Sequence, residues 1–122
     1  ELHKQRKPNA KIIGDKDPNL VDYFGWVKRK VPGCKIIIPR RDPVECVNSF
    51  INKFGHPDPS ALKRVCMDRE MRVEAACQDP EVLSFHINDL KKDAQQIFRH
   101  VADYLEVDFN GFDFSKVNKV SY

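Results

Sequence analysis

A pair of arginines followed by an aspartate–proline step is the part of this sequence best suited to chemistry. Arg40 and Arg41 follow a run of β-branched residues and directly precede Asp-Pro, a pattern typical of a helix start. A helix N-terminus presents backbone N–H groups and partial positive charge, and arginine adds a planar donor fork that fits phosphate. The segment Lys35–Ser49 therefore predicts a strand, a turn and a helix start that bind a nucleotide phosphate.

The distance from this turn to Ser49 limits how such a phosphate can be held. Ser49 lies seven residues beyond Asp42, which is roughly 10 Å along a helix axis. A phosphate shared by Arg41 and Ser49 would therefore lie against the flank of the helix, with Arg41 folded along it. The alternative is structural: the step is only a well-capped strand-to-helix turn whose arginines pair with surface acids. Spacing alone slightly favours this structural alternative.

The elements around the step follow from hydrophobic spacing and turn signals. The charges of the helix at 61–77 are expected to form a solvated face, with an anionic-glycan surface as the alternative. His86, on an apolar strand, is expected in the core. We expect helices over residues 20–31, from Asp42 to about Gly55, over 61–77 capped by Ser60, and from a cap at Asn88 or Asp89 to Leu105; strands at 35–39 and 82–87; and a brief buried strand as an option at Ile12 and Ile13.

Strands that alternate with helices predict an α/β fold with a parallel sheet covered on both faces. Ligands of such sheets bind at the C-terminal ends of the strands, which places the turn Pro39–Asp42 at the functional edge. A length of 122 residues fits one domain, so we expect a single domain over residues 1–122.

The composition excludes several classes of function. A net charge of +3 is too small to argue for nucleic acid, and no apolar run approaches the roughly 20 residues that cross a bilayer. The polar N-terminus has no signal-peptide pattern. Four cysteines without a CxxC pair predict free thiols in a reducing compartment, and the histidines lack metal-ligand spacing. We therefore expect a cytoplasmic protein without metal, or one in the Golgi lumen if the chain is part of a longer anchored protein.

Two motifs resemble segments of a known enzyme family. KIIIPRRDPVECVNSF resembles the 3′-phosphate-binding segment of sulfotransferases that use 3′-phosphoadenosine 5′-phosphosulfate (PAPS), approximately K-I-I-x-x-x-R-[DN]-P-x5-S. The resemblance implies that Arg41 and Ser49 contact the 3′-phosphate. GDKDP at Gly14–Pro18 resembles the GDKTP or NKDP element of the carbohydrate and tyrosylprotein branches. The resemblance implies that Lys16 is a catalytic group near the transferring sulfonate.

Two further stretches occur in the order typical of that family. LSFHINDLKKD resembles its YEDL strand-to-helix segment, with Ile87 in place of the aromatic residue. SKVNKVSY loosely resembles a late element on the cofactor side, which makes Ser121 a candidate contact. The fold implied by the resemblance is a three-layer parallel sheet flanked by helices, like that of P-loop nucleotide hydrolases.

The family's PRSGTT-like loop for the 5′-phosphosulfate and its Glu or His base have no match here. The chain therefore resembles the C-terminal two-thirds of a sulfotransferase domain, incomplete at its N-terminal side. The implied activity is sulfonyl transfer from PAPS to a hydroxyl or amine, in a carbohydrate by resemblance to the GDKxP branch. The partners would be this nucleotide and a small-molecule or glycan acceptor. The alternatives are a non-catalytic module that keeps only the 3′-phosphate half-site and, more weakly, a nucleic-acid-binding module.

Overall fold

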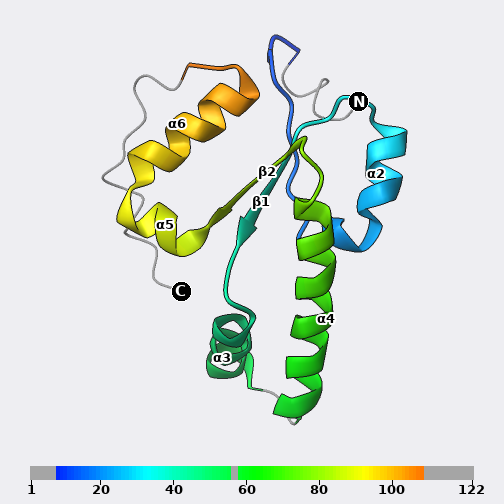
Figure 1. Ribbon diagram of the computed structural model, residues 1–122, viewed down its shortest axis with the longest axis vertical. Helices are drawn as coiled ribbons and strands as arrows, with labels where there is room; N and C mark the ends of the chain where they lie inside the picture. The colour runs from blue at the N-terminus through cyan, green and yellow to red at the C-terminus, as the bar shows by residue number, and fades with distance from the viewer. Residues whose placement is uncertain (1–7, 56–57, 109–122) are drawn as a thin grey trace.

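Two parallel strands lie at the centre of the chain in the computed structural model, which describes residues 8–55 and 58–108 (Figure 1). β1, Ile36–Arg40, pairs with β2, Val82–His86, in a register that places Arg40 beside His86. Because the pairing is parallel, both strands end at the same edge of the sheet. Both strands expected from the sequence are confirmed to within one residue at each end.

Helices flank the two strands, so the described part of the chain is an α/β structure with a small parallel sheet. In Figure 1, α5 and α6 lie on one side of the strands and α2 lies on the other. No helix of the described residues is both long and apolar enough to cross a membrane. The helices are η1 (a 3₁₀ helix, Leu20–Tyr23), α2 (Phe24–Lys30), α3 (Pro43–Phe54), α4 (Pro59–Cys77), α5 (Ile87–Lys92) and α6 (Ala94–Leu105).

The start of α3 follows its sequence signals. The Asp42 carboxylate accepts a hydrogen bond from the Val44 backbone N–H at 2.8 Å, and Pro43 occupies the first helical turn. The helix ends at Gly55, whose φ of 69° is a conformation that suits glycine. The prediction of a capped helix from Asp42 to about Gly55 is confirmed.

The helix expected over residues 20–31 begins as the 3₁₀ helix η1 and continues as α2. Two further helix starts also differ from the sequence expectation. The cap of α4 is Asp58, whose carboxylate accepts from the Ala61 N–H at 3.0 Å, so the expectation of Ser60 as cap is wrong. The single helix expected from Asn88 or Asp89 is two helices. Asp93 ends α5 in a non-helical conformation (φ −146°, ψ 82°) and caps α6 by accepting from the Gln96 N–H at 3.1 Å. In both cases a nearby aspartate competes successfully for the cap.

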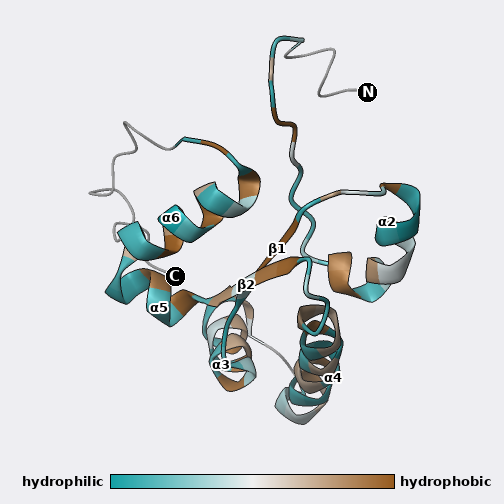
Figure 2. Cartoon of the chain, turned by 45° about the horizontal axis from the view of Figure 1, so that its top comes forward, coloured by the Kyte–Doolittle hydropathy of each residue, from teal (hydrophilic) through white to brown (hydrophobic). Residues whose placement is uncertain are grey.

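A small core forms where β1 meets α4. Ile36, Ile38 and Ala76 are buried, and residues of η1, α2 and β2 pack against them. Figure 2 shows the two strands as a hydrophobic centre between more polar helices. His86 is exposed at the end of β2, so the expectation of a core histidine is wrong.

The optional strand at Ile12 and Ile13 is absent. The two side chains are 48% and 41% exposed, and the described sheet contains only β1 and β2. A strand needs a partner for its backbone hydrogen bonds, and neither described strand pairs with this segment. The segment therefore runs as an irregular approach to η1.

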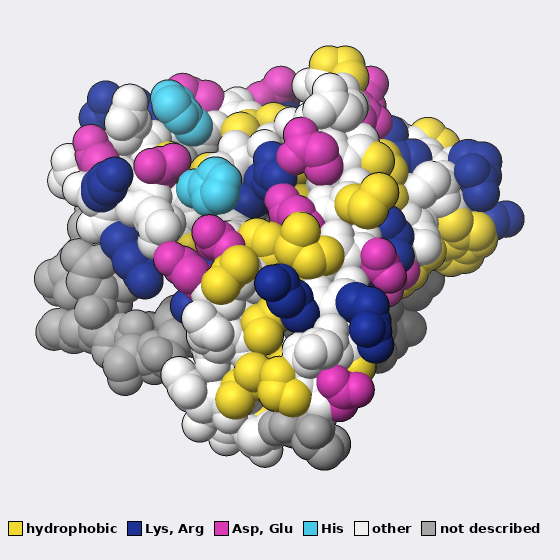
Figure 3. Space-filling model, turned by 60° about the horizontal axis from the view of Figure 1, so that its bottom comes forward, with side chains coloured by type: hydrophobic (Ala, Val, Ile, Leu, Met, Phe, Trp, Pro, Cys, Tyr) yellow, Lys and Arg dark blue, Asp and Glu magenta, His cyan; other side chains and the backbone are white. Residues whose placement is uncertain are grey.

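Apolar side chains of α3 and α4 remain at the surface away from this core. Phe54 is 66% exposed and Met71 is 72% exposed, and Val65 is also exposed. Figure 3 shows hydrophobic side chains among lysines and arginines on the face toward the joined ends of these helices. The stabilising burial of this chain is therefore concentrated at the sheet and at the helix ends beside it.

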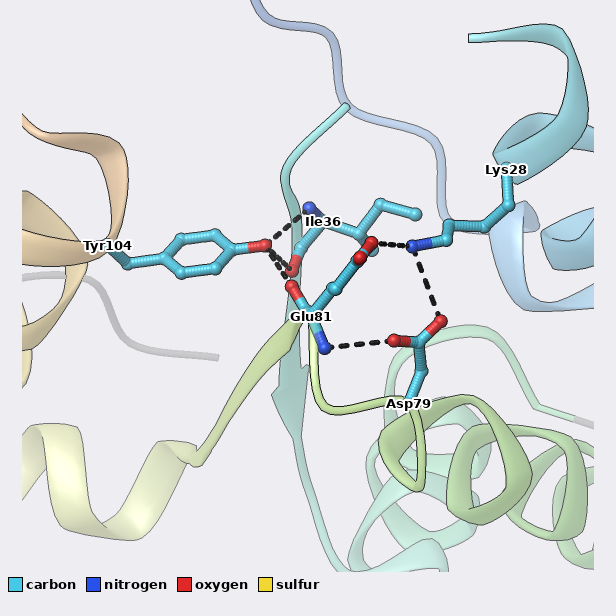
Figure 4. A network of polar contacts seen from close by, with 5 residues as sticks. All are labelled: Lys28, Ile36, Asp79, Glu81 and Tyr104. Carbon is cyan, nitrogen blue, oxygen red and sulfur yellow. Dashed lines mark hydrogen bonds and ion pairs between the residues drawn. The ribbon is translucent and has the colours of Figure 1, made fainter. Parts of the chain in front are cut away.

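A polar network fixes the beginning of the two strands (Figure 4). The Tyr104 hydroxyl of α6 accepts from the Ile36 N–H at 2.9 Å and donates to the Glu81 carbonyl at 2.5 Å. Lys28 of α2 pairs with the Glu81 carboxylate and, at 3.3 Å, with Asp79. The hydrogen bond to Glu81 is the main cause of a raised Lys28 pKa. The network joins helices from both sides of the sheet at the edge opposite Arg40.

Candidate anion-binding site

A cavity of about 700 Å³ lies beside β1, between the loop that precedes η1 and the facing sides of α3 and α4. This volume is in the usual range of small-ligand sites. Its walls are mainly apolar, from the strand and the two helices, and its charged groups come from four parts of the chain. The charged residues that line it are Asp15, Lys16, Asp17, Lys35, Arg40, Arg41, Arg69 and Glu70.

Arg40, the last residue of β1, already has two carboxylate partners. Its Nη2 lies 2.6 Å from Glu70 Oε1 and 2.5 Å from Glu74 Oε2, both on α4. The hydrogen bonds that Arg40 donates, first to Glu70 and then to Glu74, raise the pKa of Arg40. Its side chain is only 19% exposed. The charge of Arg40 is therefore compensated, and its contacts attach the end of β1 to α4.

Arg41, the next residue, is bound more weakly. Its Nε lies 3.5 Å from Glu45 Oε2, too long for a strong hydrogen bond, and the side chain is 31% exposed. In the described part of the chain, its side chain makes no other hydrogen bond or ion pair. Arg41 therefore keeps most of its donors for a ligand, whereas Arg40 matches the structural alternative that the sequence left open.

Lys16 reaches the same cavity from a turn held by its neighbours. The Lys16 N–H donates to Asp15 Oδ1 at 2.8 Å, and Asp17 Oδ1 accepts from the Asn19 N–H at 2.8 Å. The Asp17 carbonyl accepts from the Leu20 N–H at 3.3 Å, which leads the turn into η1. No ion pair of the Lys16 side chain is found among the residues that the structure describes. The fold thus brings Lys16 and Arg41, distant in sequence, to one cavity.

Ser49 lies outside the lining of this cavity. It is partly buried on α3, whose residues in the lining are Pro43, Cys46 and Phe50. Ser49 precedes Phe50 by one residue and is therefore rotated by about 100° around the helix. A group that contacts both Arg41 and Ser49 would extend from the cavity onto the flank of α3. Ser121, the other serine suggested by resemblance, lies outside the described residues.

The contribution of α4 to the cavity was not expected from the sequence. Arg69 and Glu70 are partly buried and line the cavity, so the expectation of a wholly solvated charged face on this helix is wrong. One signal was present in the sequence. The two charges interrupt an apolar stripe between Cys66 and Val73 at helical spacing, where a packing residue would be usual.

Two cysteine thiols also line the cavity. Cys46 and Cys66 line the cavity, and all four cysteines are free, as the sequence predicts. Burial raises the pKa of the Cys46 thiol, so it stays protonated at neutral pH. Three cations of the lining already have carboxylate partners: Arg40 pairs with Glu70, Arg69 with Asp22 and Lys35 with Glu106. Lys16 and Arg41 are therefore the lining cations left to attract an anion, and the carboxylates of Asp15 and Asp17 line the same cavity.

The described residues form an α/β structure with a cavity beside a parallel strand, and Lys16 and Arg41 are among the residues that line it. A family model described as Sulfotransferase family matches residues 1–111. The chain therefore belongs to the sulfotransferase family, whose members transfer sulfonyl groups. Comparisons with the curated proteins and with the solved structures gave no match.

Proposed function

We propose that the chain binds PAPS in this cavity and transfers its sulfonyl group to a hydroxyl or amine of a carbohydrate acceptor. Membership of the sulfotransferase family supports the reaction class, and PAPS is the usual sulfonyl donor of that family. The observation that carries the proposal is that Lys16 and Arg41 line one cavity beside β1.

The chemistry of the cavity fits this donor. An adenine base needs apolar walls, which the β1 isoleucines and Phe50 provide. Phosphate and sulfonate groups need cationic hydrogen-bond donors, and the side chains of Lys16 and Arg41 both have donors without a strong partner among the described residues. The start of α3 adds backbone N–H groups and partial positive charge beside Arg41.

Each side chain has a distinct part in the proposed reaction. Arg41, with Ser49 on the flank of α3, holds the 3′-phosphate, and this remote binding orients the reactive end of the nucleotide. The Lys16 ammonium stabilises negative charge that grows on the sulfonate and leaving phosphate oxygens, without forming a covalent bond. When bound, PAPS supplies the activated sulfonyl group. A general base takes the proton of the acceptor as the new bond to sulfur forms.

Calorimetric titration with adenosine 3′,5′-bisphosphate tests the nucleotide site. We expect Arg41→Ala to weaken binding by about tenfold or more, because hydrogen bonds to charged groups are the strong ones. Arg29→Ala, which removes an exposed arginine of α2, is the matched control and should bind like the wild type. With adenosine 5′-phosphate, which lacks the 3′-phosphate, the Arg41 effect should disappear. Equal binding by wild type and Arg41→Ala, or binding by neither, would contradict the assignment.

A further inference from the structure

Two arginines of α4 contact the helical turn that follows the Lys16 loop. Arg69 Nη2 lies 3.0 Å from Asn19 Oδ1 and 3.6 Å from Asp22 Oδ2. Arg72 Nε lies 2.9 Å from the other carboxylate oxygen of Asp22. The arginines are three residues apart and therefore lie on one side of α4. They hold Asp22 from both of its oxygens, which fixes η1 against α4.

These contacts connect to Lys16 through a short series of hydrogen bonds. Asn19, which accepts from Arg69, donates its backbone N–H to Asp17 Oδ1 at 2.8 Å. Asp17 is bonded covalently to Lys16, so α4, η1 and the lysine turn form one connected unit. Arg69 also lines the cavity that Lys16 faces. Movement of η1 away from α4 would therefore move the Lys16 turn away from the cavity wall.

We propose that Arg69 and Arg72 are positioning residues that hold the Lys16 turn at the cavity. This inference rests on the proposed function, in which Lys16 contacts the sulfonate end of the donor. Arg69 and Arg72 act through Asn19 and Asp22, not through a contact of their own with the nucleotide. Substitution of either arginine should therefore impair only the interaction of Lys16 with the donor.

The first test compares two nucleotides that differ in the group Lys16 contacts. Lys16→Met should weaken PAPS binding about tenfold and weaken binding of adenosine 3′,5′-bisphosphate less, because the bisphosphate keeps the 5′-phosphate but has no sulfonate. Arg69→Gln and Arg72→Gln should each weaken PAPS binding about threefold and weaken bisphosphate binding less. Arg72→Lys should recover most of the loss, because it keeps a cation beside Asp22. Arg64→Gln, an exposed arginine of the same helix, is the control.

The combination of Lys16→Met with Arg69→Gln separates positioning from direct contact. In the Lys16→Met background, Arg69→Gln should weaken PAPS no further, since there is no lysine left to position. If Arg69→Gln weakens PAPS binding about threefold in that background too, Arg69 contacts the nucleotide itself, and the proposal is overturned. PAPS binding by Arg69→Gln equal to that by Arg64→Gln also overturns it.

Hydrogen exchange in the nucleotide-free chain provides a test that does not depend on the proposed function. The Leu20 and Asp22 amides are hydrogen-bonded to Asp17 and Asn19. They should exchange about threefold faster in Arg69→Gln than in Arg64→Gln, because η1 opens more often. Unchanged exchange overturns the positioning role whatever the chain binds. If the wild type binds neither nucleotide, the proposed function is contradicted, and the exchange rates alone decide the positioning role.

Discussion

Arg40, the last residue of β1, and the adjacent Arg41 have different environments, and this difference favours Arg41 over Arg40 as the ligand contact of the proposed site. Arg40 is held by two carboxylates of α4, whereas Arg41 has one long contact with Glu45. Sequence spacing alone does not distinguish the two residues as phosphate ligands, since both lie between the strand and the same helix. The pairing of Arg40 depends on α4, which lies far along the chain, and no local pattern contains it.

Substitution of the two arginines should therefore give opposite results. Arg40→Met should lower the free energy of unfolding by about 1–2 kcal/mol, because Glu70 and Glu74 lose their partner. Arg41→Met should change stability by less than about 0.5 kcal/mol but impair nucleotide binding. Urea unfolding followed by circular dichroism measures the first effect and calorimetry the second. A larger loss of stability in Arg41→Met than in Arg40→Met would contradict this division.

Asp79 should make stability depend on pH in the acid range. Its pKa is lowered by the hydrogen bond from the Glu81 N–H and by Lys28. A carboxyl with a lowered pKa in the folded state stabilises the fold above its unfolded pKa, about 4. That contribution is lost as the pH falls through the folded pKa, because both states are then protonated.

The variant Asp79→Asn isolates this effect. It should be less stable than the wild type by a constant amount between about pH 5 and pH 7, and the difference should shrink below about pH 4. Urea unfolding at a series of pH values measures it. A difference that widens toward low pH would have the wrong sign and would rule out the role given to Asp79.

At the scale of elements, two neighbouring residues, Asp58 and Ser60, can be compared as the N-cap of α4. Asp58→Ala should cost about 1 kcal/mol, because the Ala61 N–H loses its acceptor. Ser60→Ala should cost less than about 0.5 kcal/mol, because Ser60 lies within the first turn. Thermal and urea unfolding of both variants give the comparison. A larger loss of stability in Ser60→Ala than in Asp58→Ala would show that Ser60 is the cap.

The Tyr104 hydroxyl is one of the contacts that attach α6 to the strands, together with the hydrogen bond from Lys35 Nζ to the Tyr104 carbonyl. Tyr104→Phe keeps the ring but removes the acceptor of the Ile36 N–H and the donor to the Glu81 carbonyl. We expect a loss of about 1–3 kcal/mol, the usual cost of partly buried groups left without a partner. Tyr23→Phe is the matched control, since Tyr23 contacts Trp26 through its ring. Equal stability of Tyr104→Phe and wild type would show that the helix is held by other contacts.

Local signals predicted the elements well and their contacts poorly. The Asp-Pro step placed the start of α3, and the isoleucine run placed β1, because both depend on neighbouring residues. The break at Asp93 was missed because apolar periodicity continues across it and the aspartate cap competes with that pattern. The cavity could not be predicted in full, because Arg69 and Glu70 reach it only through the packing of α4.

At the scale of the whole molecule, the two ends of the sheet have different roles. The beginning of the strands is fixed by Tyr104, Lys28 and their partners. The end of β1 opens toward the cavity with Arg41 and the start of α3. A rigid sheet that presents its C-terminal edge to a ligand is the general arrangement of parallel α/β proteins. Lys16 reaches the same cavity from the loop before η1, which contacts α4 through Asn19 and Asp22.

The proposal that the cavity beside β1 is the nucleotide site is tested most directly by the position of the bound nucleotide. Amide NMR spectra of the chain, titrated with adenosine 3′,5′-bisphosphate, report which residues it approaches. We expect saturable shifts in the Lys16 turn and at the start of α3, from Arg41 to Cys46, with smaller changes in α6. The Arg41→Ala variant should lose these shifts at the same concentrations. Shifts confined to α5 and α6, or a spectrum unchanged at millimolar nucleotide, would contradict the cavity as the nucleotide site.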